Sequence, residues 1–305
     1  MTLEEKLLEI LQRTAAAEAM DWLAQECAAQ RADFVQRSFY YAFSGVSRRF
    51  DKKGGLELVE ADGGDLDVLV PGFTLEGWDQ FRLGRVILLL VLAEQGQDVF
   101  LETLQKLLGT ADLREQAAIY SALPLFPRGE EYVEMAQDGL RTNIVDVFDA
   151  VALGNSYPAQ YFSDEAWNQM VLKALFISRP LFKIVGIDQR GNAALVEALS
   201  DLAHERWSAG RWVSPELWRS CQNFISPQVV EDMQHLCESQ QPGQREVVAL
   251  LLADDESGGA VADLKAQVSS LVDEVKAGGL TWDQVGREFG KDCFSVFDDK
   301  QSDKR

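Results

Sequence analysis

Two histidines are the first side chains in this sequence that could carry acid–base chemistry. His204 follows Asp201 at a spacing of three residues. In a helix, side chains three residues apart lie on one face and can meet. A neighbouring carboxylate orients one ring nitrogen of a histidine and favours its protonated form. His204 and Asp201 are therefore a candidate general base or one arm of a metal site, with a solvated polar face as the simpler interpretation.

A metal site needs more ligands than this pattern offers. A carboxylate site in a helical bundle takes two Glu-x-x-His elements and further glutamates, whereas this chain has Asp-x-x-His twice, at His204 and His235, and no Glu-x-x-His. Asp146 and Asp149 are the nearest approach to the aspartate-rich helices that hold magnesium diphosphate, but such pairs are common on exposed helix faces. No glycine-rich phosphate loop or nucleophile elbow occurs. We therefore expect no metal and no cofactor.

The segment from Gly154 to Phe176 is a second candidate region. Tyr157-Pro158 predicts an extended or turn conformation, and Ser163 can cap the helix that follows. This helix carries three polar side chains: Asn168, Gln169 and Lys173. Because Leu172 and Phe176 lie among them, the pattern predicts an inner helix with partly buried amides. These amides either bind neighbouring backbone and fix loops, or line a ligand pocket.

Four arginines occur near these segments in an otherwise acidic chain: Arg141, Arg190, Arg206 and Arg211. Arg206 falls on the apolar stripe of a helix predicted from Asn192 to Trp207, so we expect it to reach a carboxylate or a carbonyl. Internal pairing is one interpretation of the arginines, and recognition of an anionic ligand or partner is the other.

Helical periodicity dominates the chain, which indicates an all-α protein built as a helical-hairpin array, an α-solenoid of the HEAT type. The first helix opens at Thr2 and its apolar pattern continues to Trp22. One small β-hairpin is predicted near residues 55–72, where apolar residues alternate around Gly63-Gly64. We expect residues 1–253 to form one helical domain and residues 254–305 to form an acidic linker with a C-terminal helical extension.

Composition excludes several functional classes. The net charge of -20 would repel a phosphate backbone, so we expect no nucleic-acid partner. The apolar run from Val86 to Ala93 is too short to span a bilayer, so we do not expect an integral membrane protein. The N-terminus has no secretory pattern, and Cys27, Cys221, Cys237 and Cys293 have no metal or redox spacing, so we expect reduced thiols and a cytoplasmic location.

Several strings in this sequence resemble the EboA family. The most specific runs from Trp167 to Phe176, and others are Gly186-Ile187-Asp188-Gln189-Arg190, Gly139 to Asn143, Ala203 to Arg211 and Pro215 to Arg219. The resemblance covers about residues 77 to 225. Asn155-Ser156-Tyr157-Pro158 departs from the Asn-Pro-Tyr-Pro usual in the family, and the missing proline leaves the turn less rigid.

The resemblance implies a pathway but transfers no established catalytic residue. EboA-like proteins are associated with gene clusters for secondary metabolites, including pigment precursors, that also encode a membrane prenyltransferase and enzyme-like proteins. These proteins are the partners it implies, at the cytoplasmic face of the inner membrane. Together with the residue patterns, it gives these candidates for ligand or partner binding: Arg141, Asn143, Tyr157, Asn168, Gln169, Lys173, Asp188, Arg190, Arg206 and Arg211.

Three hypotheses follow. The leading one is a non-catalytic scaffold or adaptor that holds cluster enzymes or delivers a prenylated or aromatic intermediate. The alternative is an enzyme acting on an anionic or prenylated molecule, with His204 and Asp201 as acid and base and Asn168, Gln169 and Arg190 holding the substrate. The third is a simple carrier of an apolar metabolite.

Overall fold

The computed structural model describes residues 1–51 and 53–289. The all-α prediction is confirmed: the described residues form helices and no sheet, apart from one isolated bridge between Gly55 and Asp79. None of the helices in this part of the chain is long and apolar enough to cross a membrane. Cys293 and the charged tail lie outside the described residues, and Cys27, Cys221 and Cys237 are free thiols. The helical-hairpin array stays a prediction.

The chain divides into two compact units, unit 1 from Met1 to Tyr161 and unit 2 from Phe162 to Arg305. This division differs from the predicted boundary at residue 253, which stays a prediction. The helices predicted as a C-terminal extension pack within unit 2, as described below.

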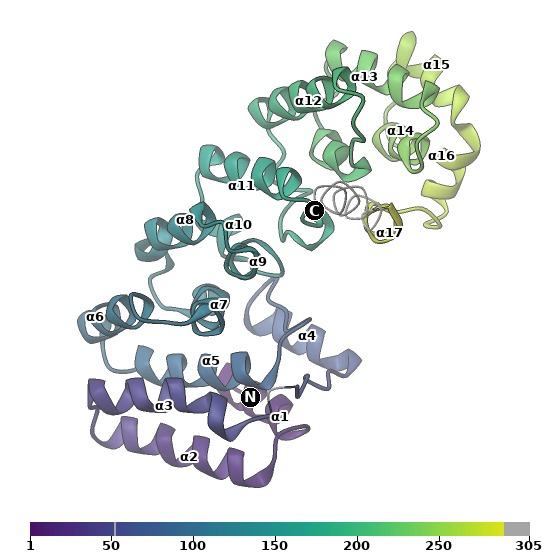
Figure 1. Cartoon of the computed structure of the whole chain (residues 1–305). Coiled ribbons are helices and arrows are strands. Elements are labelled where there is room, and N and C mark those ends of the chain that lie inside the picture. The colour runs from purple at the N-terminus through teal and green to yellow at the C-terminus, as the bar shows by residue number, and fades with distance from the viewer. Residues whose placement is uncertain (52, 290–305) are drawn as a thin grey trace, which may run out of the picture. The chain divides into compact units, whose positions relative to one another are not determined.

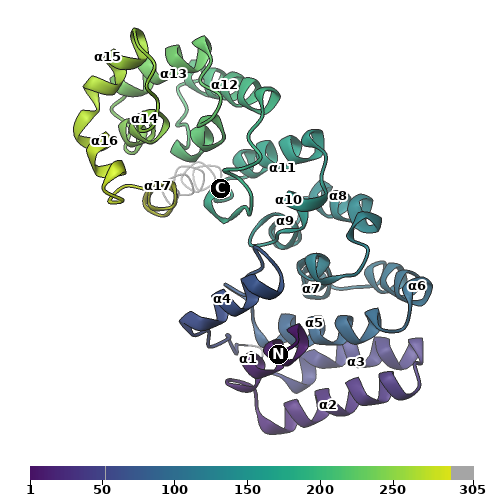
Figure 2. The ribbon, with the colours of Figure 1, turned by 180° about the vertical axis from the view of Figure 1, so that it is seen from behind.

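Unit 1 is organised around one helix that is buried on nearly every side. Its helices are α1 (Leu3–Gln12), α2 (Ala17–Ala32), α3 (Gln36–Arg49), α4 (Glu60–Leu69), α5 (Gln80–Ala93), α6 (Gln97–Leu108), α7 (Leu113–Ser121), α8 (Val133–Arg141), α9 (Val145–Ala152) and α10 (Tyr157–Tyr161), with short 3-10 turns η1 (Leu123–Leu125) and η2 (Gly129–Tyr132). The apolar run from Val86 lies in α5, which α1, α2, α3 and α7 contact. Figure 1 shows α5 among these helices, and Figure 2 shows α2 and α3 side by side from behind.

The N-terminal helix is shorter than its apolar pattern predicts. Thr2 and Glu5 form a reciprocal capping box, as the opening residues suggest. The chain leaves the helix after Gln12, however, and α2 begins at Ala17. The prediction of one helix as far as Trp22 was therefore wrong. The apolar pattern continues because α1 and α2 both pack on α5.

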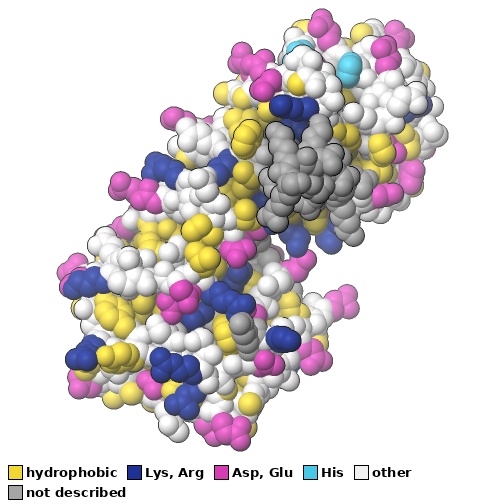
Figure 3. Space-filling view, viewed as in Figure 1, with side chains coloured by type: hydrophobic (Ala, Val, Ile, Leu, Met, Phe, Trp, Pro, Cys, Tyr) yellow, Lys and Arg dark blue, Asp and Glu magenta, His cyan; other side chains and the backbone are white. Residues whose placement is uncertain are grey.

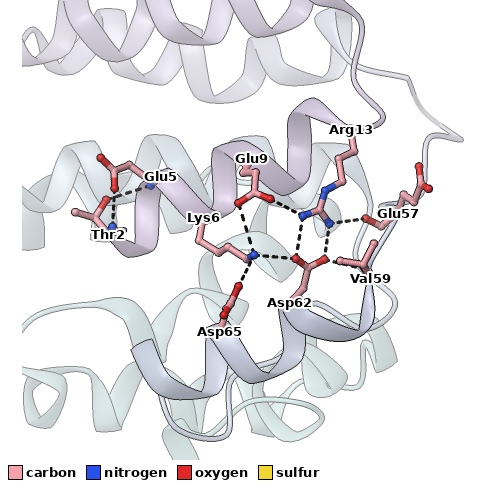
Figure 4. A network of polar contacts seen from close by, with 9 residues as sticks. All are labelled: Thr2, Glu5, Lys6, Glu9, Arg13, Glu57, Val59, Asp62 and Asp65. Carbon is pink, nitrogen blue, oxygen red and sulfur yellow. Dashed lines mark hydrogen bonds and ion pairs between the residues drawn. The ribbon is translucent and has the colours of Figure 1, made fainter.

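The predicted hairpin near residues 55–72 is wrong, since residues 60–69 form α4. A network of charges holds this helix on α1 (Figure 4). The carboxylate of Asp62 accepts hydrogen bonds from Arg13, at 2.5 and 3.0 Å, and lies 3.0 Å from the Lys6 ammonium. It also accepts from the Val59 amide at 2.8 Å, at the start of the helix. Asp62 and Leu66 lie one turn apart and are both buried. Their burial stabilises a helix here, although the apolar residues alternate as in a strand and two glycines weaken the helix.

The predicted turn at Tyr157-Pro158 takes the form of the short helix α10. Asn155 fixes it: its side-chain amide donates to the carbonyls of Tyr120 and Ala150, and its oxygen accepts from the Tyr157 amide. The Tyr157 hydroxyl donates to the Gly129 carbonyl at 2.5 Å. A Cβ at Gly129 would lie 2.3 Å from Cζ of Tyr161, so only glycine fits under that ring.

Unit 2 has a similar plan around α14. Its helices are α11 (Asp164–Phe176), α12 (Ala193–Ser208), α13 (Pro227–Glu238), α14 (Gln244–Leu252), α15 (Ala260–Gln267), α16 (Ser269–Lys276) and α17 (Trp282–Phe289), with 3-10 turns η3 (Leu181–Lys183) and η4 (Pro215–Cys221). Seven residues of α14 are buried, and α13, α15, α16, α17 and η4 all contact it. The predicted inner helix at α11 is wrong, since Phe176 is 73% exposed and only the Trp167 face is buried.

Candidate functional site

The predicted site residues do not form one cluster. Arg141, Asn143 and Tyr157 belong to unit 1, and the other candidates belong to unit 2. Arg141 is exposed and pairs with Asp138 one turn away, Asn143 is exposed, and Tyr157 is buried in its turn. On the face shown in Figure 3, acidic and basic side chains are interspersed, so the net charge is not gathered in one patch there.

In unit 2, three candidates meet at the loop of residues 186–192: Asp188 and Arg190 belong to it, and Asn168 contacts it. Arg190 donates from Nη1 to the Phe162 carbonyl at 2.9 Å and from Nη2 to Asp164 at 2.8 Å. Its guanidinium also lies 5.0 Å from the ring centroid of Trp167. This arginine therefore ties the loop to the start of α11.

Asn168 and Asn192 join the same loop to the middle of α11. Their side-chain amides bind each other reciprocally at 2.8 and 3.1 Å. Asn192 is also the cap of α12, where its oxygen accepts from the Leu195 amide. The amide of Asn168 thus fixes a helix end. Gln169, by contrast, is exposed and lies 3.5 Å from Glu165.

The other end of the loop binds an arginine in η4. Asp188 accepts two hydrogen bonds from Arg219, from Nε at 2.5 Å and from Nη2 at 2.7 Å. The remaining Nη1 donates to Asp283 of α17 at 2.8 Å. This two-point geometry is the strongest form of arginine–carboxylate contact. The Arg219 side chain is 7% exposed, so the loop holds a buried cation in a fixed orientation.

Glu216 lies in the same 3-10 turn and is buried. Its carboxyl oxygens accept from the amides of Leu181, at 3.1 Å, and Phe182, at 2.5 Å. Burial raises the pKa of Glu216 to about 7, although the two amides and Arg219 favour its charged form. Unit 2 therefore contains an acid that can change protonation near neutral pH.

His204 meets a different carboxylate from the one predicted. Its Nε2 lies 2.6 Å from Oδ1 of Asp232 in α13, and Oδ2 of Asp232 accepts from the Ser200 hydroxyl at 2.6 Å. Asp232 is buried, whereas Asp201 is exposed. The predicted contact of His204 with Asp201 is therefore wrong. Helix α12 packs on α13, and this packing places the carboxylate of Asp232 next to His204 instead.

The two groups of candidates lie at opposite ends of α12. Asn192 and His204 are twelve residues apart along this helix, which corresponds to about 18 Å at the helical rise. His204 is instead near Trp207, whose ring centroid lies 5.5 Å from that of His204 and 4.1 Å from that of His235. No three His, Cys, Asp or Glu side chains among the described residues are grouped so as to hold a metal ion.

The remaining candidates occupy separate positions. Arg206 donates from Nε to the Trp212 carbonyl at 2.7 Å, as its place on the apolar stripe predicts. Arg211 is exposed. Lys173 is half-buried, and burial lowers the pKa of its ammonium.

Four polar residues of this region were missed as candidates: Asn192, Glu216, Arg219 and Asp232. Glu216 and Arg219 belong to a string that resembles the family, and Asn192 precedes a periodic helix, so these three had a signal in the sequence. Asp232 is the aspartate of the Asp-x-x-His pattern at His235, but that pattern does not indicate its contact with His204, which lies on another helix.

Comparison with known proteins identifies the family. A family model described as metabolite traffic protein EboA matches residues 3–222. The match reaches further toward the N-terminus than the strings that carry the resemblance. Searches of curated proteins and of solved structures give no significant match. Because the family model covers most of the sequence, the chain belongs to the EboA family.

Proposed function

We propose that this protein is a non-catalytic helical adaptor in a secondary-metabolite pathway. It holds pathway enzymes, or passes them a prenylated or aromatic intermediate, at the cytoplasmic face of the inner membrane. The family description supports the coarser part of this proposal, which is a role in handling a metabolite.

The observation that carries the proposal is that the candidate polar groups bind other parts of the protein and hold them in place. Arg190, Asn168 and Asp188 each bind a group that fixes a loop or a helix end. Catalysis requires several groups to converge within hydrogen-bond reach of one reacting centre. Side chains that hold loops in place suit a rigid surface for binding better than a reaction centre.

An enzyme is the second candidate, and the pair of His204 and Asp232 favours it. A buried carboxylate that orients a half-exposed imidazole is the arrangement of a general base. The predicted substrate-holding residues Asn168 and Arg190 bind at the other end of α12, so an active site at His204 would have to recruit different groups.

Affinity capture of the full chain from its native cells, followed by native mass spectrometry, tests both functions. The adaptor predicts co-purified pathway enzymes or a bound metabolite. Capture of neither would contradict it. His204→Gln is the matched variant: an adaptor keeps its partners and product yield, whereas an enzyme loses product yield with partners unchanged.

A further inference from the structure

Helix α17 lies on the turn that contains Glu216 and Arg219, and three of its contacts are specific. The indole Nε1 of Trp282 donates to Oε1 of Gln222 at 3.0 Å. The carboxylate of Asp283 accepts from Nη1 of Arg219 at 2.8 Å. Arg287 stands 5.1 Å from the ring centroid of Phe182. The two ends of α17 are thus attached to η4 and η3.

The middle of α17 approaches the same surface closely. A Cβ at Gly286 would lie 2.6 Å from Oε1 of Glu216 and 2.7 Å from Cδ1 of Phe182. Real Cβ atoms do not come so near, so this contact requires a residue without a side chain. Trp282 is 8% exposed, so its indole is buried where it binds Gln222.

One side of this contact lies within the residues that match the family model, and the other side lies outside them. Arg219 and Gln222 lie within the matched residues 3–222, whereas Trp282 and Asp283 lie beyond them. Arg219 is oriented by Asp188, so its position does not depend on Asp283. Removal of α17 would therefore leave on one surface a fixed guanidinium Nη1 of Arg219, the Gln222 side-chain amide, the Phe182 ring and the Glu216 carboxyl group.

Trp282 and Asp283 together present an aromatic N–H group and a carboxylate to that surface. A small molecule with an aromatic ring and one acid group offers the same chemistry. A single free arginine group suits one carboxylate, whereas a diphosphate takes several cations or a metal ion. The acceptor oxygen of Gln222 adds a preference for a ring that carries an N–H or O–H donor.

We propose that the surface formed by Arg219, Gln222 and Phe182 binds a small aromatic carboxylic acid, and that Trp282 and Asp283 of α17 occupy this site until the ligand displaces them. The inference rests on the proposed metabolite-handling function and names the class of its ligand. Displacement frees α17, so a bound ligand changes the surface that unit 2 offers to a partner.

Competition between α17 and an added ligand tests this site in the full chain. Indole-3-acetate is the probe, because it combines the indole of Trp282 with the carboxylate of Asp283. The double variant Trp282→Ala/Asp283→Ala removes the internal occupant. We expect its Kd for indole-3-acetate, measured by titration calorimetry, to be at least about tenfold lower than that of the unmodified chain, whose site is open only part of the time.

Further variants and probes show where the ligand binds. Adding Arg219→Gln to the double variant abolishes the gain, and Asp263→Ala on the exposed face of α15 leaves the Kd of the unmodified chain unchanged. Acetate, which lacks the ring, and tryptamine, which lacks the acid, bind at least about tenfold more weakly than indole-3-acetate, because each loses one charged or aromatic contact. Amide exchange of residues 282–289 in the unmodified chain quickens when indole-3-acetate is added.

A second variant keeps the test decisive if the double variant loses helix content. Gly286→Val forces α17 from Glu216 while Arg219 and Gln222 stay unchanged, and it also tightens binding. The site is disproved if neither variant binds indole-3-acetate more tightly than the unmodified chain, or if acetate or tryptamine binds equally well. That result leaves the adaptor proposal standing, since the adaptor depends on the partners and metabolites captured from native cells.

Discussion

In each unit, one buried charged side chain lies between two side chains of opposite charge. The two arrangements differ in how exposed these partners are. In unit 1, the Asp62 side chain is 1% exposed and its partners Lys6 and Arg13 are 4% and 23% exposed. In unit 2, Arg219 is 7% exposed, but Asp188 and Asp283 are 38% and 50% exposed. Loss of Asp62 would therefore leave a buried Lys6 ammonium with only exposed carboxylate partners in unit 1, whereas loss of Arg219 would leave two solvated carboxylates in unit 2.

The two arrangements also differ in what they join. Asp62 connects α4 to α1, and all its partners lie within the residues that match the family. Arg219 connects matched residues to α17, which lies outside them. The first cluster thus lies wholly within the family match, whereas the second joins matched residues to a helix outside it.

The largest expected effect is that of Asp62→Ala. It removes the buried carboxylate that binds Arg13, Lys6 and the Val59 amide, and leaves Lys6 with Asp65 as its hydrogen-bonding partner. Breaking a buried pair in this way costs about 3–5 kcal/mol of unfolding free energy. Denaturant unfolding of the full chain measures it. Asp65→Ala is the comparison variant: Asp65 also accepts a hydrogen bond from Lys6, at 2.7 Å, but it is 47% exposed, so its removal should cost only about 1 kcal/mol. Equal costs would contradict the difference drawn between buried and solvated partners.

Glu216, which lies in η4 with Arg219, and Asp62 should respond to pH in opposite directions. The pKa of Glu216 is raised from 4.5 to about 7 by burial, so the folded state binds more protons between these values and stability falls as pH rises through them. The hydrogen bond from Arg13 holds the pKa of Asp62 well below its usual range, so its contribution is lost only as pH falls below the unfolded pKa of 3.8.

Between pH 5 and 7.5, therefore, the Glu216 effect should appear and the Asp62 effect should not. The Glu216 effect amounts to at most about 3 kcal/mol for a shift of this size. Unfolding midpoints of the unmodified chain and of Glu216→Gln, measured across this interval, give the comparison. We expect the amide variant to show the weaker loss of stability toward high pH, and parallel curves for the two proteins would refute the assignment.

Arg219→Met should have a smaller effect on stability and a local effect on exchange. Asp188 and Asp283 can be hydrated when they lose their partner, so the expected cost is about 1–2 kcal/mol. Hydrogen exchange should quicken in residues 282–289 and stay unchanged in α4. For Asp62→Ala we expect the reverse: faster exchange in α4 and unchanged exchange in residues 282–289. A uniform change in both variants would show that the two clusters are not independent.

The smallest effects concern glycines in α4 and α17, where the same substitution should have opposite signs. A Cβ at Gly63 or Gly64 meets nothing within 4 Å, so each change to Ala should stabilise the chain by about 0.5–1 kcal/mol. Gly286→Ala should destabilise it by about 1 kcal/mol or more, because the new methyl group meets Glu216 and Phe182. Denaturation midpoints of the three variants decide this.

Sequence reasoning was most successful where a helix could be inferred from its own residues. The cap at Thr2 and the buried character of α5 follow from local pattern alone. The hairpin at residues 55–72 failed because Asp62 is paired with side chains of α1, far away in the sequence. Local glycine and alternation rules do not contain that information.

The site was less predictable for the same reason. Arg190 and Asp188 were identified from a family string, but their partners were not. The i, i+3 rule gave His204 the wrong carboxylate, since it considers one helix only. The contact of Arg219 with Asp283 joins residues 64 positions apart, and no spacing in the sequence indicates it.

The close contact between Gly129 and the Tyr161 ring has an evolutionary consequence. A side chain at position 129 and an aromatic ring at position 161 exclude each other, because the Cβ would lie 2.3 Å from Cζ of that ring. Substitutions at the two positions are therefore coupled. Across the family, we expect covariation: a residue larger than glycine at 129 should occur only in sequences with a smaller residue at 161.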